Sequence, residues 1–189
     1  MQQHLTPWMV ESAYRYWSAA KYLLSGHDMM AVAQVNAAIG MEILLKSFIA
    51  RPDGNHGKVN ETYDLDLSLI KAAHLELQRL GKVDADRKSA DRHDLLTLFY
   101  SVPESVRSRV GLNQEEEWIE RYRNVFTNAR YPYEVKSSRG YDDILVDVLG
   151  RLIRQVVEWY REQGSKDTFI VCYGLTPQKP SWTSFKSVP

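Results

Sequence analysis

The residues with the most evident chemistry lie in a polar stretch between Glu120 and Glu134. The pattern predicts the end of an amphipathic helix that continues into an Arg-Tyr-Pro-Tyr-Glu turn. A helix that only packs against its neighbours needs no cluster of arginine and asparagine side chains. Guanidinium groups match phosphate oxygens in a forked geometry, so this face could line a phosphate-binding cleft. The polar set on it comprises Arg121, Arg123, Asn124, Asn128 and Arg130.

Two plainer interpretations stay open for this stretch. The arginines could form a solvated face of local ion pairs, with Glu117 and Arg121 as one pair at i,i+4. Tyr131 could contact a ligand beside Arg130, or the turn around Pro132 could only set the angle between two core helices. The candidate ligand-binding residues are Arg123, Asn124, Asn128, Arg130 and Tyr131.

The composition leaves room for a packed core and argues against several classes of protein. Of 189 residues, 44% are apolar and 25% are charged, and the formal net charge is zero. A whole-surface field that attracts nucleic acid is therefore not expected. The single cysteine, Cys172, excludes a disulfide within the chain, and the sequence has no His-Glu-x-x-His motif or Cys/His cluster. We expect no metal and no cofactor.

Nothing in the sequence predicts a membrane protein. The first residues lack a basic segment followed by an apolar run, so we expect no signal peptide. A membrane span needs roughly 20 apolar residues. The longest apolar stretch, at 31–50, is interrupted by Gln34, Asn36, Glu42 and Lys46. We expect a cytoplasmic protein without a membrane partner.

Hydrophobic periodicity predicts helices over most of the chain. They cover about 7–25, 28–50, 65–80, 93–100, 103–110, 113–131 and 142–163. The helix at 28–50 carries apolar residues on two faces, which is typical of a central helix. The stretch 168–173 has the one convincing strand pattern. The predicted fold is all-α, an up-down bundle of about four to six helices over residues 1–163, with an extended or strand-containing tail over 164–189.

Two further polar features lie outside the arginine-rich stretch. Glu42 and Lys46 stand at i,i+4 on an otherwise apolar helix. They mark either a polar cleft in the bundle or, as we favour, the exposed edge of that helix. His93 is either a displaced acid–base group or, more commonly for such a pattern, part of a helix start in which Asp94 favours the first turn.

These features follow one another in an order known from a protein family. The segment Ala37-Ala-Ile-Gly-Met-Glu-Ile-Leu-Leu-Lys46 precedes His93-Asp-Leu-Leu-x-Leu, which precedes Arg123-Asn and Arg130-Tyr-Pro132. This order resembles the HEPN superfamily, the helical domains named for higher eukaryotes and prokaryotes nucleotide-binding. The resemblance covers most of the chain but not the tail. It implies a helical bundle that often pairs as a homodimer, and it is consistent with a place in a toxin–antitoxin or defence system.

Many members of that family resemble metal-independent ribonucleases with an Arg-x4-6-His motif. There the Arg stabilises the phosphate and the His takes part in acid–base work at the 2′-hydroxyl. Arg123 and Asn124 match the start of the motif. Asn128, Ala129 and Arg130 stand where the His is expected, and no histidine follows His93. None of these side chains transfers a proton readily at neutral pH.

Three functions stay open on these grounds. We favour a module without catalytic activity that binds a nucleotide, RNA or a protein partner encoded nearby. The first alternative is a metal-independent endoribonuclease with a rearranged site that combines Arg123 with His93. The second alternative is a purely structural dimerisation domain.

Overall fold

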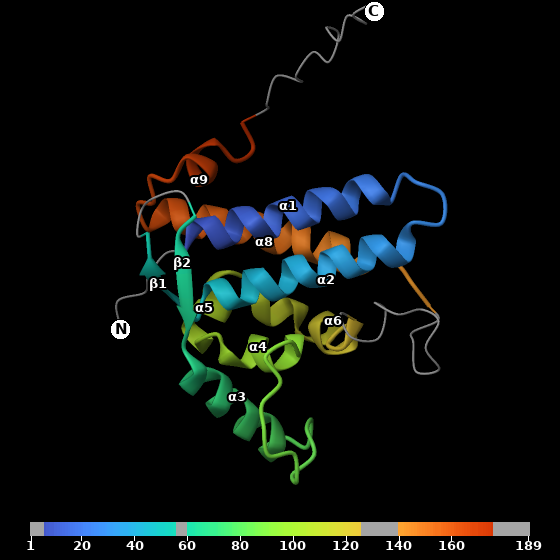
Figure 1. Ribbon diagram of the computed structural model, residues 1–189, viewed down its shortest axis with the longest axis vertical. Helices are drawn as coiled ribbons and strands as arrows, with labels where there is room; N and C mark the ends of the chain where they lie inside the picture. The colour runs from blue at the N-terminus through green and yellow to red at the C-terminus, as the bar shows by residue number, and fades with distance from the viewer. Residues whose placement is uncertain (1–5, 56–59, 126–139, 176–189) are drawn as a thin grey trace, which may run out of the picture.

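The computed structural model describes residues 6–55, 60–125 and 140–175, and within these ranges the chain is mainly helical (Figure 1). The prediction of a mainly helical protein is confirmed there. The long helices are α1 (Pro7–Leu23), α2 (Met30–Ser47) and α8 (Ile144–Glu162). The shorter elements are α3 (Leu67–Arg79), α4 (Leu95–Ser101), α5 (Glu104–Arg109), the 3-10 helix η1 (Leu112–Glu115), α6 (Glu116–Arg121), α9 (Thr168–Cys172) and the strands β1 (Ala50–Gly54) and β2 (Thr62–Leu65).

Helices α1, α2 and α8 lie side by side and form the main layer of the core (Figure 1). Helix α2 packs against α1, α8 and α4, and its side chains Ala37 and Leu44 are fully buried. The prediction of a central helix is thereby confirmed. Gly40 permits close packing, since a Cβ at this position would lie 2.7 Å from Leu149 Cδ2 and 3.1 Å from the carbonyl oxygen of Ala13.

A second layer of short helices lies across α2, with α4 at its centre (Figure 1). Helix α4 packs against α2, α3 and α6. Its start is set by Asp94, whose Oδ1 accepts from the amide of Leu96 at 3.2 Å. Aspartate at this position satisfies an amide that has no partner inside the helix. The predicted helix start at His93 and Asp94 is confirmed within two residues, and it leaves His93 just outside the helix.

The hairpin of β1 and β2 was not expected from the sequence. The two strands pair antiparallel, although β1 contains Pro52 and Gly54, which favour a loop. Tertiary pairing outweighs this local preference. The amide of Asp66 extends the contact by donating to the carbonyl of Ile49 at 2.8 Å. The hairpin thus ties the end of α2 to the start of α3.

The predicted strand at 168–173 is wrong, because this segment forms helix α9. Asp167 begins the helix by accepting from the amides of Phe169 at 2.9 Å and Ile170 at 3.2 Å. Ile170 is fully buried, and the ring of Phe169 lies 5.2 Å from that of Tyr14 on α1. A cap and packing against α1 and α8 outweigh the strand preference of so short a run. Residues 176–189 of the predicted tail lie outside the described ranges.

The predicted helix over 113–131 is interrupted. Helix α6 ends at Arg121, and residues 122–124 form a turn. Two tertiary contacts hold this turn: the Tyr122 hydroxyl donates to Asp142 at 2.5 Å, and the Arg123 carbonyl accepts from the amide of Leu95 at 3.3 Å. Burial raises the pKa of Tyr122, and the neighbouring Asp142 raises it further. Arg121 and Arg123 therefore do not share one continuous helix face.

Within the ranges given above, none of the helices combines the length and the apolar character needed to cross a bilayer.

Candidate functional site

Arg123 and Asp94 form a forked ion pair between the turn after α6 and the start of α4. Arg123 Nε donates to Asp94 Oδ1 at 3.0 Å, and Nη2 donates to Oδ2 at 2.6 Å. Nη1 donates to the carbonyl oxygen of Lys82 at 2.9 Å. The Arg123 side chain is 18% exposed and that of Asp94 is 2% exposed. Most of the guanidinium is therefore held by the protein itself.

The Asp94 carboxylate accepts hydrogen bonds from several groups. In addition to Arg123, it accepts from the amide of Leu96 and, at 2.7 Å, from the hydroxyl of Thr97. These donors compensate the carboxylate for the water that it loses on burial. Asp94 thus joins the start of α4 to the turn that carries Arg123, and this structural role was not foreseen from the sequence.

His93 lies directly before this pair and contacts helix α2. Its Nδ1 is 3.0 Å from Glu42 Oε1, and Lys46 Nζ donates to the same oxygen at 2.6 Å. The Glu42 and Lys46 side chains are 11% and 16% exposed. The expectation that both lie on an exposed edge of α2 is wrong, because α4 packs against α2 and His93 meets the pair there. Both side chains are instead mostly covered, and the alternative of a polar cleft stays a prediction.

These five side chains, Glu42, Lys46, His93, Asp94 and Arg123, are called the His93–Arg123 cluster below. Glu42 orients the imidazole, since a partner on one ring nitrogen fixes the role of the other. The two carboxylates, the ammonium and the guanidinium cancel in charge, so the cluster becomes positive only when the imidazole is protonated.

A second polar network lies beside the cluster. The ammonium of Lys82 is 3.3 Å from Glu116 Oε1 and also donates to Glu120. The Tyr100 hydroxyl donates to Glu116 at 2.7 Å. The hydrogen bond to Glu120 raises the pKa of Lys82. The positive charge of Lys82 is compensated locally, so this neighbouring surface contributes no extra attraction for a phosphate.

Two of the residues singled out from the sequence, Arg123 and His93, belong to neighbouring networks, because Arg123 pairs with Asp94, the residue that follows His93 in the chain. Asn124 is exposed in the turn beside Arg123. The roles of Asp94 and Glu42 as their partners were missed. A signal existed for Glu42, which is the single acidic residue in α2. The remaining candidates Asn128, Arg130 and Tyr131 lie outside the described residues.

Among the residues that the structure describes, no group of three or more His, Cys, Asp or Glu side chains could hold a metal ion. No protein-family model, curated protein or solved structure gives a significant match to this chain. The chemistry of the site therefore rests on its own residues.

Proposed function

We propose that this chain is a HEPN-like module that binds RNA or a nucleotide through phosphate, without cleaving it. The observation that supports the proposal is that His93 and Asp94 are adjacent in the chain, with the His93 imidazole 3.0 Å from Glu42 and the Arg123 guanidinium bound to Asp94. Arginine has five N–H donors, and its bonds to Asp94 and Lys82 use three of them. A phosphate oxygen could accept from the other two, and a protonated His93 would supply net positive charge.

The charge balance of the cluster limits how strongly salt should affect binding. Asp94 neutralises Arg123, so hydrogen bonding contributes more than net charge. Each phosphate neutralised on a single strand changes the slope of log K against log salt by about −0.7. We expect a slope near the value for one phosphate, which is far shallower than that of a protein with an extended basic surface.

Binding is tested by fluorescence anisotropy of labelled single-stranded RNA with the full chain in EDTA. His93→Ala should weaken binding about tenfold, because one charge-assisted hydrogen bond contributes roughly 1.5 kcal/mol. His27→Ala is the matched control, since the His27 side chain is 93% exposed in the loop between α1 and α2. Equal affinity of the wild type and His93→Ala would contradict the proposal.

A second function, a metal-independent endoribonuclease, is favoured by the contact between Glu42 and His93. In that reaction His93 would accept the proton of the 2′-hydroxyl as its oxygen bonds to phosphorus, and Arg123 would donate to the phosphate oxygens. The bond from phosphorus to the 5′-oxygen would break, water would protonate that oxygen, and a 2′,3′-cyclic phosphate would remain on the other fragment. Cleavage of the same RNA in EDTA, with a loss of at least about 100-fold in His93→Ala, would establish it. RNA that stays intact with the wild-type protein would exclude it.

We also propose that the chain forms a homodimer. Exposed apolar side chains gather where α1 and α2 are joined, and a second copy could cover them: Tyr22 is 80% exposed, Val32 45% and Met30 38%. Light scattering should then give twice the chain mass of 21.9 kDa, and Val32→Asp should shift the protein towards monomer. A dimer that binds no RNA would favour the purely structural alternative. A protein partner encoded nearby, and a role in a toxin–antitoxin or defence system, remain part of the proposal.

A further inference from the structure

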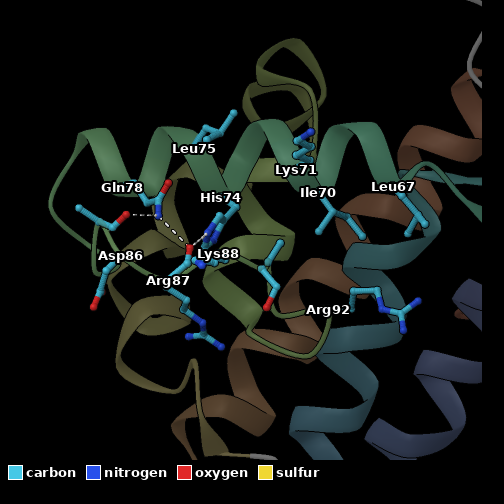
Figure 2. Close-up of a pocket in the computed structure, with 13 residues that line it drawn as sticks. Leu67, Ile70, Lys71, His74, Leu75, Gln78, Asp86, Arg87, Lys88 and Arg92 are labelled. Atoms are coloured by element: carbon cyan, nitrogen blue, oxygen red, sulfur yellow. Dashed lines mark hydrogen bonds between the residues drawn. The ribbon is translucent and has the colours of Figure 1, made fainter.

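A groove runs along α3, and none of the five cluster residues lines it (Figure 2). It has a volume of about 460 Å³, with α3 on one side and the chain at 85–92 on the other. Ile70 and His74 are its most buried lining residues, at 2% and 4% exposure. Leu67 and Leu75 also line it but are 54% and 56% exposed. The groove therefore has a buried base, formed by one apolar side chain and one imidazole, and open apolar sides.

The wall opposite α3 is fastened to this helix by hydrogen bonds (Figure 2). His74 Nε2 lies 2.8 Å from the carbonyl oxygen of Arg87. The Gln78 side chain, one turn further along, donates to the carbonyls of Asp84, Ala85 and Arg87 at 3.1, 3.2 and 3.0 Å. The groove is thus formed before any ligand arrives, which lowers the entropic cost of binding.

The lining of the groove has a net positive charge, with four basic side chains, Lys71, Arg87, Lys88 and Arg92, and one acidic side chain, Asp86. Its basic residues Lys71, Lys88 and Arg92 form no ion pair within the described part of the chain. Arg87 is compensated by Asp91 at 3.3 Å. The chain as a whole has a net charge of zero, so three uncompensated cations around one apolar groove are a local concentration of charge. They favour an anionic ligand.

The shape and composition of the groove narrow the class of ligand. No Phe, Tyr or Trp lines it, so nucleic-acid bases would find no surface for stacking. A small molecule is usually buried to about 70–90% in its site, whereas the leucines here are more than half exposed. The stretch of α3 from Leu67 to Gln78 is roughly 17 Å long, which matches about three turns of another helix.

The C-terminal segment of this chain is poorly suited to occupy the groove along α3. Residues 176–189 contain Lys179 and Lys186 and no acidic residue, so their charge opposes binding to a positive groove. A partner with carboxylates on both sides of an apolar stripe would match both the positive charge and the apolar side chains of the groove.

We propose that the groove along α3 binds an acidic amphipathic helix of a partner protein. Apolar side chains of that helix would cover Leu67, Ile70 and Leu75, as in other complexes in which a helix occupies a groove. Its carboxylates would pair with Lys71, Lys88 and Arg92 at the edges. This inference does not depend on phosphate binding by the His93–Arg123 cluster.

The experiment selects peptides of roughly 12 residues, about the length of the groove, from a random phage-displayed library. The folded full chain is the bait, and the double variant Lys71→Glu/Arg92→Glu is used for counter-selection. Peptides with several Asp or Glu residues and apolar residues at i and i+4 should be enriched. The synthetic consensus peptide should bind at least about tenfold more weakly to Leu75→Ser and to the double variant.

Two matched variants control for surface changes in general. Leu80→Ser alters a leucine of similar exposure, 41%, that follows α3 and does not line the groove. Lys21→Glu reverses an exposed charge on α1. Both should bind the peptide as the wild type does, and circular dichroism should show that every variant stays folded.

Several results would overturn the proposal. These are a lack of enrichment over the counter-selection, enrichment of basic or aromatic peptides, or equal peptide affinity for the wild type and the double variant. RNA binding that is lost in Lys71→Glu/Arg92→Glu but kept in His93→Ala would assign the groove to nucleic acid instead. Binding of the anionic dye anilinonaphthalene sulfonate there, without peptide enrichment, would assign it to small amphiphiles.

Discussion

The guanidinium of Arg123 donates hydrogen bonds to both carboxylate oxygens of Asp94, at 3.0 and 2.6 Å. This pair joins the turn after α6 to the start of α4. In the sequence, this arginine stands out as a contact for a ligand. In the structure, it first holds two segments together, and any ligand would have to share it with Asp94. Stability and binding must therefore be measured separately for every change at this pair.

Arg123→Ala should lower the free energy of unfolding by about 3–5 kcal/mol, because it leaves a buried carboxylate without its counter-charge. Urea denaturation followed by circular dichroism measures this change. The double variant Asp94→Asn/Arg123→Ala should lose less than the sum of the single changes, since the uncompensated charge is gone. A loss below about 1 kcal/mol in Arg123→Ala would mean that the pair is not structural.

Glu42→Ala should cost about 3 kcal/mol, because Lys46 and Glu42 are both mostly covered and the ammonium would lose its partner. The control is Glu11→Ala, which breaks a pair of the same i,i+4 spacing and the same 2.6 Å length with Arg15, whose side chain is 67% exposed. That change should cost no more than about 0.5 kcal/mol. Equal losses in the two variants would show that burial of the Glu42 pair has no energetic weight.

The pH dependence of stability should report on Asp66 at the start of α3. The hydrogen bond from the Ser68 hydroxyl is the main cause that lowers the pKa of Asp66, with the Ser68 and Leu69 amides and Arg51 assisting. Because folding lowers this pKa, the ionised carboxylate stabilises the folded state at pH values above the pKa of aspartate in the unfolded chain, which is about 3.9. This contribution is lost as the pH falls through the lower, folded value.

Asp66→Asn should therefore be less stable than the wild type at pH 6, and the difference should shrink as the pH falls below about 4. Urea denaturation at a series of pH values measures it. A difference that stays constant down to about pH 2.5 would contradict the role of the ionised carboxylate.

Gly150→Ala should destabilise the contact between α1 and α8. A Cβ at this position would lie 2.6 Å from Trp17 Nε1, the atom that donates to the carbonyl of Val146 at 3.0 Å. Forcing a methyl group into such a space costs about 1–3 kcal/mol. Thermal unfolding and the near-ultraviolet signal of tryptophan report the change. Gly140→Ala is the control, because a Cβ at that position would meet no described atom within 4 Å, and it should leave both signals unchanged.

Local sequence patterns were sufficient to predict much of the helical scaffold. The apolar row of α8 predicts burial directly, and an aspartate before an apolar run correctly indicates the start of α4. Of the two apolar faces of α2, one is buried, whereas Val32 on the other is 45% exposed. The same reasoning failed for 168–173, where a β-branched and aromatic run satisfies strand statistics while Asp167 and the packing of Ile170 favour a helix. It also failed for β1, because Pro52 and Gly54 indicate a loop when the partner strand is unknown.

For the candidate site, the sequence identified residues with suitable side chains but did not predict which residues they would pair with. Arg123 and His93 could be selected because their chemistry is intrinsic to each side chain. That Asp94 holds Arg123, and that Glu42 holds His93 across 51 positions of the chain, depends on how α4 lies against α2 and α6.

The amino-acid order alone thus determined most of the segments that become helices and which side chains can carry charge or a proton, because these properties depend largely on neighbours a few residues away. The tertiary structure decided which charges are cancelled and which stay open. It neutralises Arg123 against Asp94 and leaves Lys71, Lys88 and Arg92 without an ion pair among the described residues along α3. Electrostatic compensation acts through space, so it is settled only when distant segments pack together.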